Sequence, residues 1–282
     1  MKKKIKVALK IVISIALIYL VLRNIDTSKL FETIKKSNIW WLLVAFIFFN
    51  LSKIVSAIRL NWYFKDCGVN LSTKTNLILY YIGMFYNLFL PGGIGGDGYK
   101  IYLLKKRFNT KVSKLLQATL LDRLSGLIAL LFLAALLFIF SKYSTLYPLL
   151  KWLAVTVAIV IYPIFIYMHK RLFKGFLTYL KQTTLYGLLV QILQLITAIF
   201  IILALKDSVP IVEFLFLFLF SSVVAVLPLT IGGVGAREFT FLYGLKLLNL
   251  EPTSGVAFSF IFFLITFISS AIGALFLHKE IF

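Results

Sequence analysis

Long apolar runs separated by short basic segments fill almost the whole chain. The runs cover about 7–22, 39–58, 77–90, 115–140, 149–168, 184–205, 210–227 and 254–277. An α-helix rises about 1.5 Å per residue, so roughly 20 apolar residues cross a hydrocarbon layer about 30 Å thick. We expect six of these runs to cross a membrane as helices. The other two, 77–90 and 210–227, are expected to enter the membrane and return.

The two expected re-entrant runs differ in whether their length excludes a full crossing of the membrane. The run 77–90 is too short to cross before Pro91 ends it. The run 210–227, at about 18 residues, is just long enough to cross. If it crosses, the C-terminus moves to the other side of the membrane, and the interpretation of the chain as an inverted repeat weakens.

The composition agrees with an all-α integral membrane protein. Hydrophobic residues make up 61% of the 282 residues and charged residues only 14%. The net charge of +20 comes from Lys and Arg in the short segments between runs, where such residues set orientation and meet anionic headgroups. We therefore expect location in the plasma membrane and no nucleic-acid binding. The single Cys67 and the two histidines, His169 and His278, give no basis for a metal site or other cofactor.

The distribution of Lys and Arg predicts that both termini are cytoplasmic. With this orientation, 19 of the 30 Lys and Arg residues fall in cytoplasmic segments and nine in exterior segments. The N-terminus starts like a signal peptide, with Lys2, Lys3 and Lys4 before an apolar run, but no small-residue cleavage site follows. We expect it to stay as the first transmembrane helix.

One Pro/Gly-rich stretch occurs twice in the same register, 137 positions apart. It reads Leu-Pro-Gly-Gly-Ile-Gly-Gly-Asp-Gly-Tyr-Lys over 90–100 and Leu-Pro-Leu-Thr-Ile-Gly-Gly-Val-Gly-Ala-Arg over 227–237. Each copy follows one of the expected re-entrant runs. The chain then divides into a first half, 1–140, and a second half, 141–282, within one transmembrane domain. Three crossings in each half would invert the second half relative to the first, as in many transporters.

Glycine-rich breaks and charged residues inside apolar sequence are candidates for a binding site. Unwound backbone exposes N–H groups that can bind an anion, and guanidinium groups bind phosphate oxygens. Intramembrane carboxylates would balance these cations, bind a cationic headgroup or relay protons. The candidate substrate-binding residues are Pro91, Gly92, Gly93, Gly95, Gly96, Asp97, Lys100, Asp122, Arg123, Gly232, Gly233, Gly235, Arg237 and Glu238.

Two simpler interpretations of these residues stay open. The glycines would serve only close helix packing, and the charges would form internal ion pairs. Asp122 and Arg123 are adjacent on a helix and are expected to find partners elsewhere. Gln191 and Gln194 are expected to hydrogen-bond neighbouring helices. We find no set of residues typical of a catalytic site.

The motifs resemble those of the lysylphosphatidylglycerol synthase transmembrane-region family, also called the flippase-like domain family. The resemblance rests on Pro91–Asp97 with Lys100, on Asp122-Arg123 and on Ile231–Glu238. It implies a membrane module that moves lipids between leaflets. In bifunctional members a separate soluble domain transfers lysine from lysyl-tRNA to phosphatidylglycerol, and the cationic product repels antimicrobial peptides.

This chain departs from those members in two ways. It holds no polar segment long enough for the soluble domain, so we expect no aminoacyl transfer by this chain alone. At 229–230, Leu-Thr replaces the Gly-Gly of the first copy, which makes the second break less glycine-rich.

The resulting hypotheses fall into three classes. The first is a flippase or transporter that moves a phospholipid, lysyl-phosphatidylglycerol among them, or a polyprenyl-phosphate carrier. The alternative is the membrane part of a phosphatidylglycerol lysyltransferase system that works with a separate soluble synthase. The third is a scaffold in which the charges are structural. A homo-oligomer also stays open.

Overall fold

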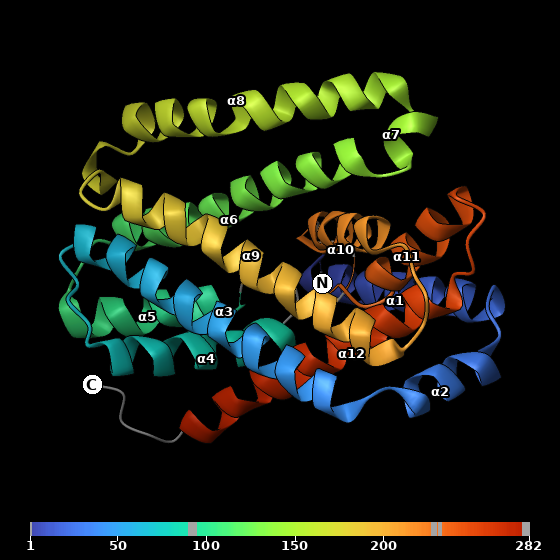
Figure 1. Cartoon of the computed structure of the whole chain (residues 1–282). Helices are drawn as coiled ribbons and strands as arrows, with labels where there is room; N and C mark the ends of the chain where they lie inside the picture. The colour runs from blue at the N-terminus through green and yellow to red at the C-terminus, as the bar shows by residue number, and fades with distance from the viewer. Residues whose placement is uncertain (1, 90–94, 227–229, 231–232, 278–282) are drawn as a thin grey trace.

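The computed structural model describes residues 2–89, 95–226, 230 and 233–277, with side chains from about residue 11. Every regular element in these ranges is helical, and Figure 1 shows how the helices pack side by side. The elements are α1 (Lys2–Arg23), α2 (Thr27–Lys36), α3 (Ile39–Asp66), α4 (Thr73–Phe89), α5 (Gly95–Phe108), α6 (Val112–Phe140), α7 (Tyr143–Leu146), α8 (Pro148–Leu172), η1 (Lys174–Phe176), α9 (Leu180–Leu205), α10 (Ile211–Val226), α11 (Ala236–Leu247), α12 (Thr253–Ala271) and η2 (Ile272–Phe276).

Five stretches are long and apolar enough to cross a membrane as single helices. They are α3, α6, α8, α9 and the continuous α12–η2 segment. The number rises to six if α1 and α2, which meet at an angle of 91°, count as one bent span. The chain is thus a multi-pass helical membrane protein, as predicted. The expected first crossing, 7–22, lies within α1.

The segment 23–38, expected as a polar connection, is a second short helix. Asp26 caps α2 by accepting a hydrogen bond from the Lys29 amide (3.1 Å), and Asn38 caps α3 by accepting one from the Trp40 amide (2.9 Å). The buried Leu30 of α2 packs into the main hydrophobic core. This amphipathic pattern lets α2 lie against the bundle although its composition is polar.

Both predicted re-entrant runs form helical hairpins with the helix that follows each break. α4 packs along α5, and α10 packs along α11. α4 and α10 have 17 and 16 residues, which gives lengths of about 25 Å, short of the hydrocarbon thickness. Whether each run returns to its own side of the membrane at its break stays a prediction, for 210–227 as for 77–90.

The connections between helices gather at two opposite ends of the bundle. In Figure 1 those joining α3 to α4, α5 to α6 and α8 to α9 lie at the left. Three other connections lie at the right: the one from α1 to α2, the one from α6 to α8 through α7, and the one from α11 to α12. Three of the basic segments predicted as cytoplasmic, 59–76, 99–114 and 169–183, therefore share one end. Which side of the membrane this end faces stays a prediction.

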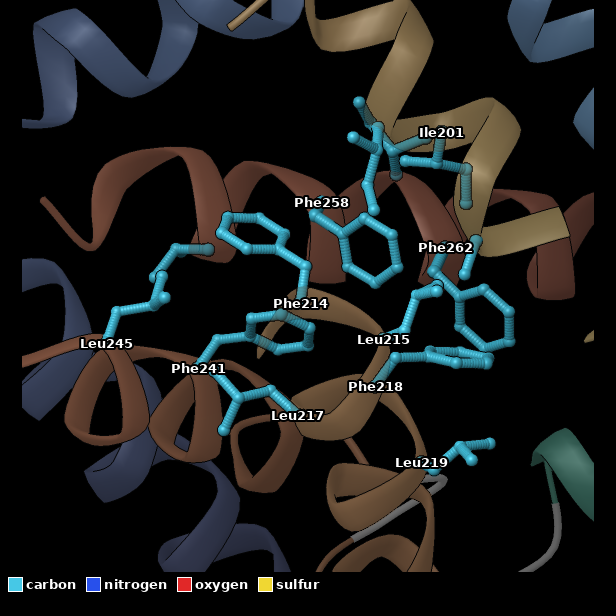
Figure 2. Close-up of a cluster of buried hydrophobic side chains, with 14 of the residues drawn as sticks. Ile201, Phe214, Leu215, Leu217, Phe218, Leu219, Phe241, Leu245, Phe258 and Phe262 are labelled. Carbon is cyan, nitrogen blue, oxygen red and sulfur yellow. The ribbon is translucent and has the colours of Figure 1, made fainter. Parts of the chain in front are cut away.

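The main core is a cluster of phenylalanines between α9, α10, α11 and α12, shown in Figure 2. Phe241 contacts Phe258 with ring centroids 5.0 Å apart, and Phe218 contacts Phe262 at 4.9 Å. Aromatic pairs of this kind contribute beyond simple burial of area. They fix the α10–α11 hairpin against α12.

The predicted orientation can be tested with single cysteines. Burial raises the pKa of the native Cys67 thiol, which lies outside the candidate spans, to about 11, so it should react slowly with maleimides near neutral pH. In a Cys67→Ala protein, a membrane-impermeant maleimide applied to intact cells should label exposed Ser28→Cys and Thr145→Cys. It should label exposed Ser113→Cys only after permeabilisation. The reverse pattern would show that the orientation is opposite.

Candidate functional site

The first break ends at a partly buried three-residue ion cluster. Asp97, in the first turn of α5, accepts from the Lys100 ammonium group (Oδ1–Nζ 2.8 Å) and from the Arg123 guanidinium of α6 (Oδ2–Nε 2.6 Å). The side chains of Lys100 and Asp97 are 6% and 16% exposed, whereas that of Arg123 is 43% exposed. The shared carboxylate links α5 to α6.

Glycines bring α4 and α5 into direct backbone contact above this cluster. A Cβ on Gly96 would overlap the backbone of Gly83, and a Cβ on Gly83 would lie 3.0 Å from the Lys100 side chain. The Gly96 amide donates to the Asn87 side chain of α4 (2.8 Å), which satisfies one of the unpaired N–H groups at the start of α5. The glycines of this hairpin thus serve close packing.

A second buried ion pair links α3 to α6. Arg59 donates from Nε to Asp122 Oδ1 at 2.8 Å, and the side chains are 5% and 13% exposed. Gly126 of α6 and Gly187 of α9 lie next to the guanidinium, where a Cβ would be in ordinary van der Waals contact with Nη1 at 3.4 or 3.6 Å. The adjacent Asp122 and Arg123 therefore find separate partners, as predicted.

At the second break Glu238 holds the start of α11. Its carboxylate accepts from the Gly235 amide (2.7 Å) and from the Ser259 hydroxyl of α12 (3.0 Å). Gly233 and Gly235 have φ of 81° and 84°, in the left-handed region that favours glycine. The glycine positions at this break are thus required by the backbone conformation.

Arg237 directly precedes Glu238 in the chain and makes different contacts. Its Nη1 donates to the Ser222 hydroxyl of α10 (3.0 Å), and its guanidinium carbon lies 4.9 Å from the Phe262 ring centroid. Its neighbour Glu238 lies beyond ion-pair distance and acts on it only electrostatically. Arg237 thus joins α10, α11 and α12 through a hydroxyl and a ring.

The predicted site residues are therefore divided between two places. Asp97, Lys100 and Arg123 form one network and Asp122 joins a second beside it, while Arg237 and Glu238 stand at the other break. These contacts among the first-half charges are the internal ion pairs of the simpler interpretation, and their role in substrate binding stays a prediction. The residues Pro91, Gly92, Gly93 and Gly232 lie outside the described residues. Gly95 begins α5.

Two cations on α3 were missed by the sequence analysis. Arg59 was placed in a connection because the apolar run ended at about residue 58, yet α3 continues to Asp66. The helical continuation could have been seen in Leu60, Trp62, Tyr63 and Phe64, which follow Arg59 with only Asn61 between them. Lys53 lies inside the predicted helix but received no role. Its ammonium group sits 4.4 Å from the Phe49 ring centroid.

The glutamines of α9 act as expected. Gln191 donates to the Gly126 carbonyl of α6 (3.1 Å), and Gln194 donates to the Ser52 hydroxyl of α3 (2.5 Å). This confirms the prediction that they hydrogen-bond neighbouring helices. Polar contacts of this type hold helices together where water is absent.

An apolar cavity of about 250 Å³ lies beside the second break. α1 and α2 form one wall, and α11 and α12 the other. Glu238 is the charged residue in its lining. The other lining residues are apolar: Ile18, Val21, Leu22, Leu30, Phe31, Ile34, Val234, Val256, Phe260 and Phe263. A cavity of this composition suits a hydrocarbon chain better than a polar solute.

These features define a multi-pass helical membrane protein with an ion cluster at its first broken helix and two charged residues, Arg237 and Glu238, at its second. The lysylphosphatidylglycerol synthase TM region family matches residues 7–273, and the chain therefore belongs to this family. The resemblance expected from the motifs is confirmed.

The chain is also similar to two archaeal proteins. It is 30% identical over 212 residues to the UPF0104 membrane protein MJ1078 of Methanocaldococcus jannaschii, a match that covers 66% of this chain and 89% of that protein. It is 25% identical over 135 residues to the UPF0104 membrane protein PH1989 of Pyrococcus horikoshii, covering 47% and 40%. No solved structure matches the chain at a significant level.

The close approach of α4 and α5 predicts different effects at two neighbouring glycines. Gly96→Ala should lower the free energy of unfolding by about 1–3 kcal/mol, because the new Cβ overlaps the Gly83 backbone. Gly98→Ala is the matched control, since nothing lies within 4 Å of its Cβ position. Equilibrium unfolding in mixed micelles measures both. Equal stability of the two variants would contradict the packing role.

The Arg59–Asp122 pair predicts a large cost for losing one partner. Asp122→Asn should destabilise the protein by about 3–5 kcal/mol, because Arg59 is left as an uncompensated buried charge. The double variant Arg59→Leu with Asp122→Leu should recover much of this loss. Glu32→Gln, which removes an exposed ion pair with Lys36, is the control and should change stability little. If Asp122→Asn is as harmless as Glu32→Gln, the pair does not hold α3 to α6.

Proposed function

We propose that the chain is a lipid transporter of the flippase type, built from two inverted halves that rock against each other. The observation that carries the proposal is a reciprocal packing of the two broken segments. α4, from the first half, packs against α12, the last long helix of the second half. α10, from the second half, packs against α6, the last long helix of the first half.

Other helix contacts follow the same correspondence. α3 and α9, which are equivalent in the proposed halves, make the most extensive helix contact and run side by side through the centre of Figure 1. α5 packs on α6 as α11 packs on α12. Broken helices in corresponding positions of two halves are typical of secondary transporters, in which the halves move around a central site.

The chemistry near the breaks favours a lipid as the substrate. Charged side chains lie beside an apolar cavity, so one molecule with a charged headgroup and an acyl chain can meet both. The family description names lysylphosphatidylglycerol, and we include this lipid among the candidate substrates with other phospholipids and lipid-linked carriers. The plasma membrane and the predicted orientation belong to the same proposal.

A leaflet-resolved assay in proteoliposomes tests this function. Fluorescent phospholipids with different headgroups are reconstituted with the protein, and a membrane-impermeant quencher reports movement between leaflets. The wild type should exchange lipids in a headgroup-dependent way. Arg237→Ala should slow the exchange by about tenfold or more, the equivalent of roughly 1.4 kcal/mol in a barrier.

Lys246→Ala is the matched control. Lys246 is an exposed cation on the same helix, α11, and it donates to Asn24. This variant should transport like the wild type. Folded wild-type protein that exchanges no lipid with any headgroup would contradict the proposed function.

A further inference from the structure

Lys53 is a cation at the midpoint of a membrane span. It lies halfway along α3, a helix of 28 residues, and its side chain is partly buried. A charge at this depth is costly in a bilayer unless a partner neutralises it or water reaches it. The described residues include no carboxylate within ion-pair distance of Lys53.

Lys53 and Arg237 stand on two aromatic rings that touch each other. The Lys53 ammonium lies over Phe49 and the Arg237 guanidinium over Phe262. The two rings meet edge to face with centroids 5.7 Å apart, and Figure 2 shows Phe262 at the edge of the aromatic core. Lys53 and Arg237 also act on each other electrostatically. Two helices that are distant in sequence thus place their cations over two rings in contact with each other.

The charges in this part of the molecule do not balance. Two acids of the first half, Asp97 and Asp122, are already paired, because Asp97 binds Lys100 and Arg123 and Asp122 binds Arg59. The carboxylate of Glu238 accepts from Gly235 and Ser259. In the part of the chain that the structure describes, Lys53 and Arg237 thus remain as two cations without a paired acid. Like charges in a low-dielectric setting repel strongly, so the arrangement favours an added anion.

We propose that Lys53 and Arg237 bind the phosphate of an anionic phospholipid. A planar guanidinium with an ammonium group is a good combination for phosphate oxygens. The location on membrane-embedded helices favours a lipid over free phosphate. This inference deepens the proposed function by assigning the charge class of its substrate, and it makes Lys53 a substrate-binding residue. The site lies apart from the ion cluster at Asp97.

Lipid-dependent stability in a neutral detergent tests binding without transport. Phosphatidylglycerol should raise the melting temperature of the wild type, and phosphatidylcholine, which has no net charge, should raise it less. Lys53→Gln and Arg237→Gln should each weaken the apparent affinity for phosphatidylglycerol about ten- to hundredfold, as expected for loss of a charge-assisted hydrogen bond. Lys65→Gln, an exposed cation on the same helix, should bind like the wild type.

Three outcomes would overturn the proposal. One is an unchanged affinity in both Gln variants. Another is an equal loss in Lys65→Gln, which would indicate a diffuse charge effect. The third is protection by inorganic phosphate alone at the same concentration, which would overturn the assignment to a lipid. The detergent assay measures binding and not transport. If phosphatidylglycerol binds as predicted but the protein exchanges no lipid in proteoliposomes, only the proposed function is refuted.

Charge reversal separates a binding role from a structural one. Lys53→Glu would place a carboxylate beside Arg237, so the lipid-free protein should be more stable than Lys53→Gln. The same variant should lose the stabilisation by phosphatidylglycerol. A Lys53→Glu protein that is less stable than Lys53→Gln, or that still responds to the anionic lipid, contradicts the proposal.

Discussion

The need to neutralise charge inside an apolar bundle determines how this protein is arranged. A lone charge in the hydrocarbon region is costly, and contact with a cation from another element is one way to neutralise a carboxylate there. Asp97 does this between α5 and α6, and Asp122 between α3 and α6. α6 therefore carries both contacts on adjacent residues. Together they tie the α4–α5 hairpin and α3 to one long helix of the bundle.

The glycines make these contacts geometrically possible. Gly83 and Gly96 allow the backbones of α4 and α5 to meet, and Gly187 allows α9 to approach the Ser125 carbonyl of α6. At the second break, positive φ at Gly233 and Gly235 turns the chain into α11. In the glycine-rich stretches, Gly96 thus serves close helix packing, and Gly233 and Gly235 serve the turn into α11. Lys53 and Arg237, which have no paired acid among the described residues, are where we expect a ligand.

The sequence predicted much of this architecture because hydrophobic length and Pro/Gly breaks are local signals. These signals predict the long helices and the two short broken ones. The separate partners of Asp122 and Arg123 follow from their adjacent positions on one helix. The helix α2 was not predicted, because its polar composition hid a narrow apolar face around Leu30. Arg59 was missed because a polar residue at the end of an apolar run looks like a connection. The pairing of Lys53 with Arg237 depends on Phe49 meeting Phe262, and no local pattern reveals that contact.

A structure determined in nanodiscs that contain phosphatidylglycerol would test the central claim most directly. We predict headgroup density with its phosphate between the Lys53 ammonium and the Arg237 guanidinium, and an acyl chain along the neighbouring helices. The ion pairs at Asp97 and Asp122 should be unchanged. An acid of the chain itself paired with Lys53 or Arg237, with lipids bound only at the periphery, would contradict the claim that this cation pair receives a lipid phosphate.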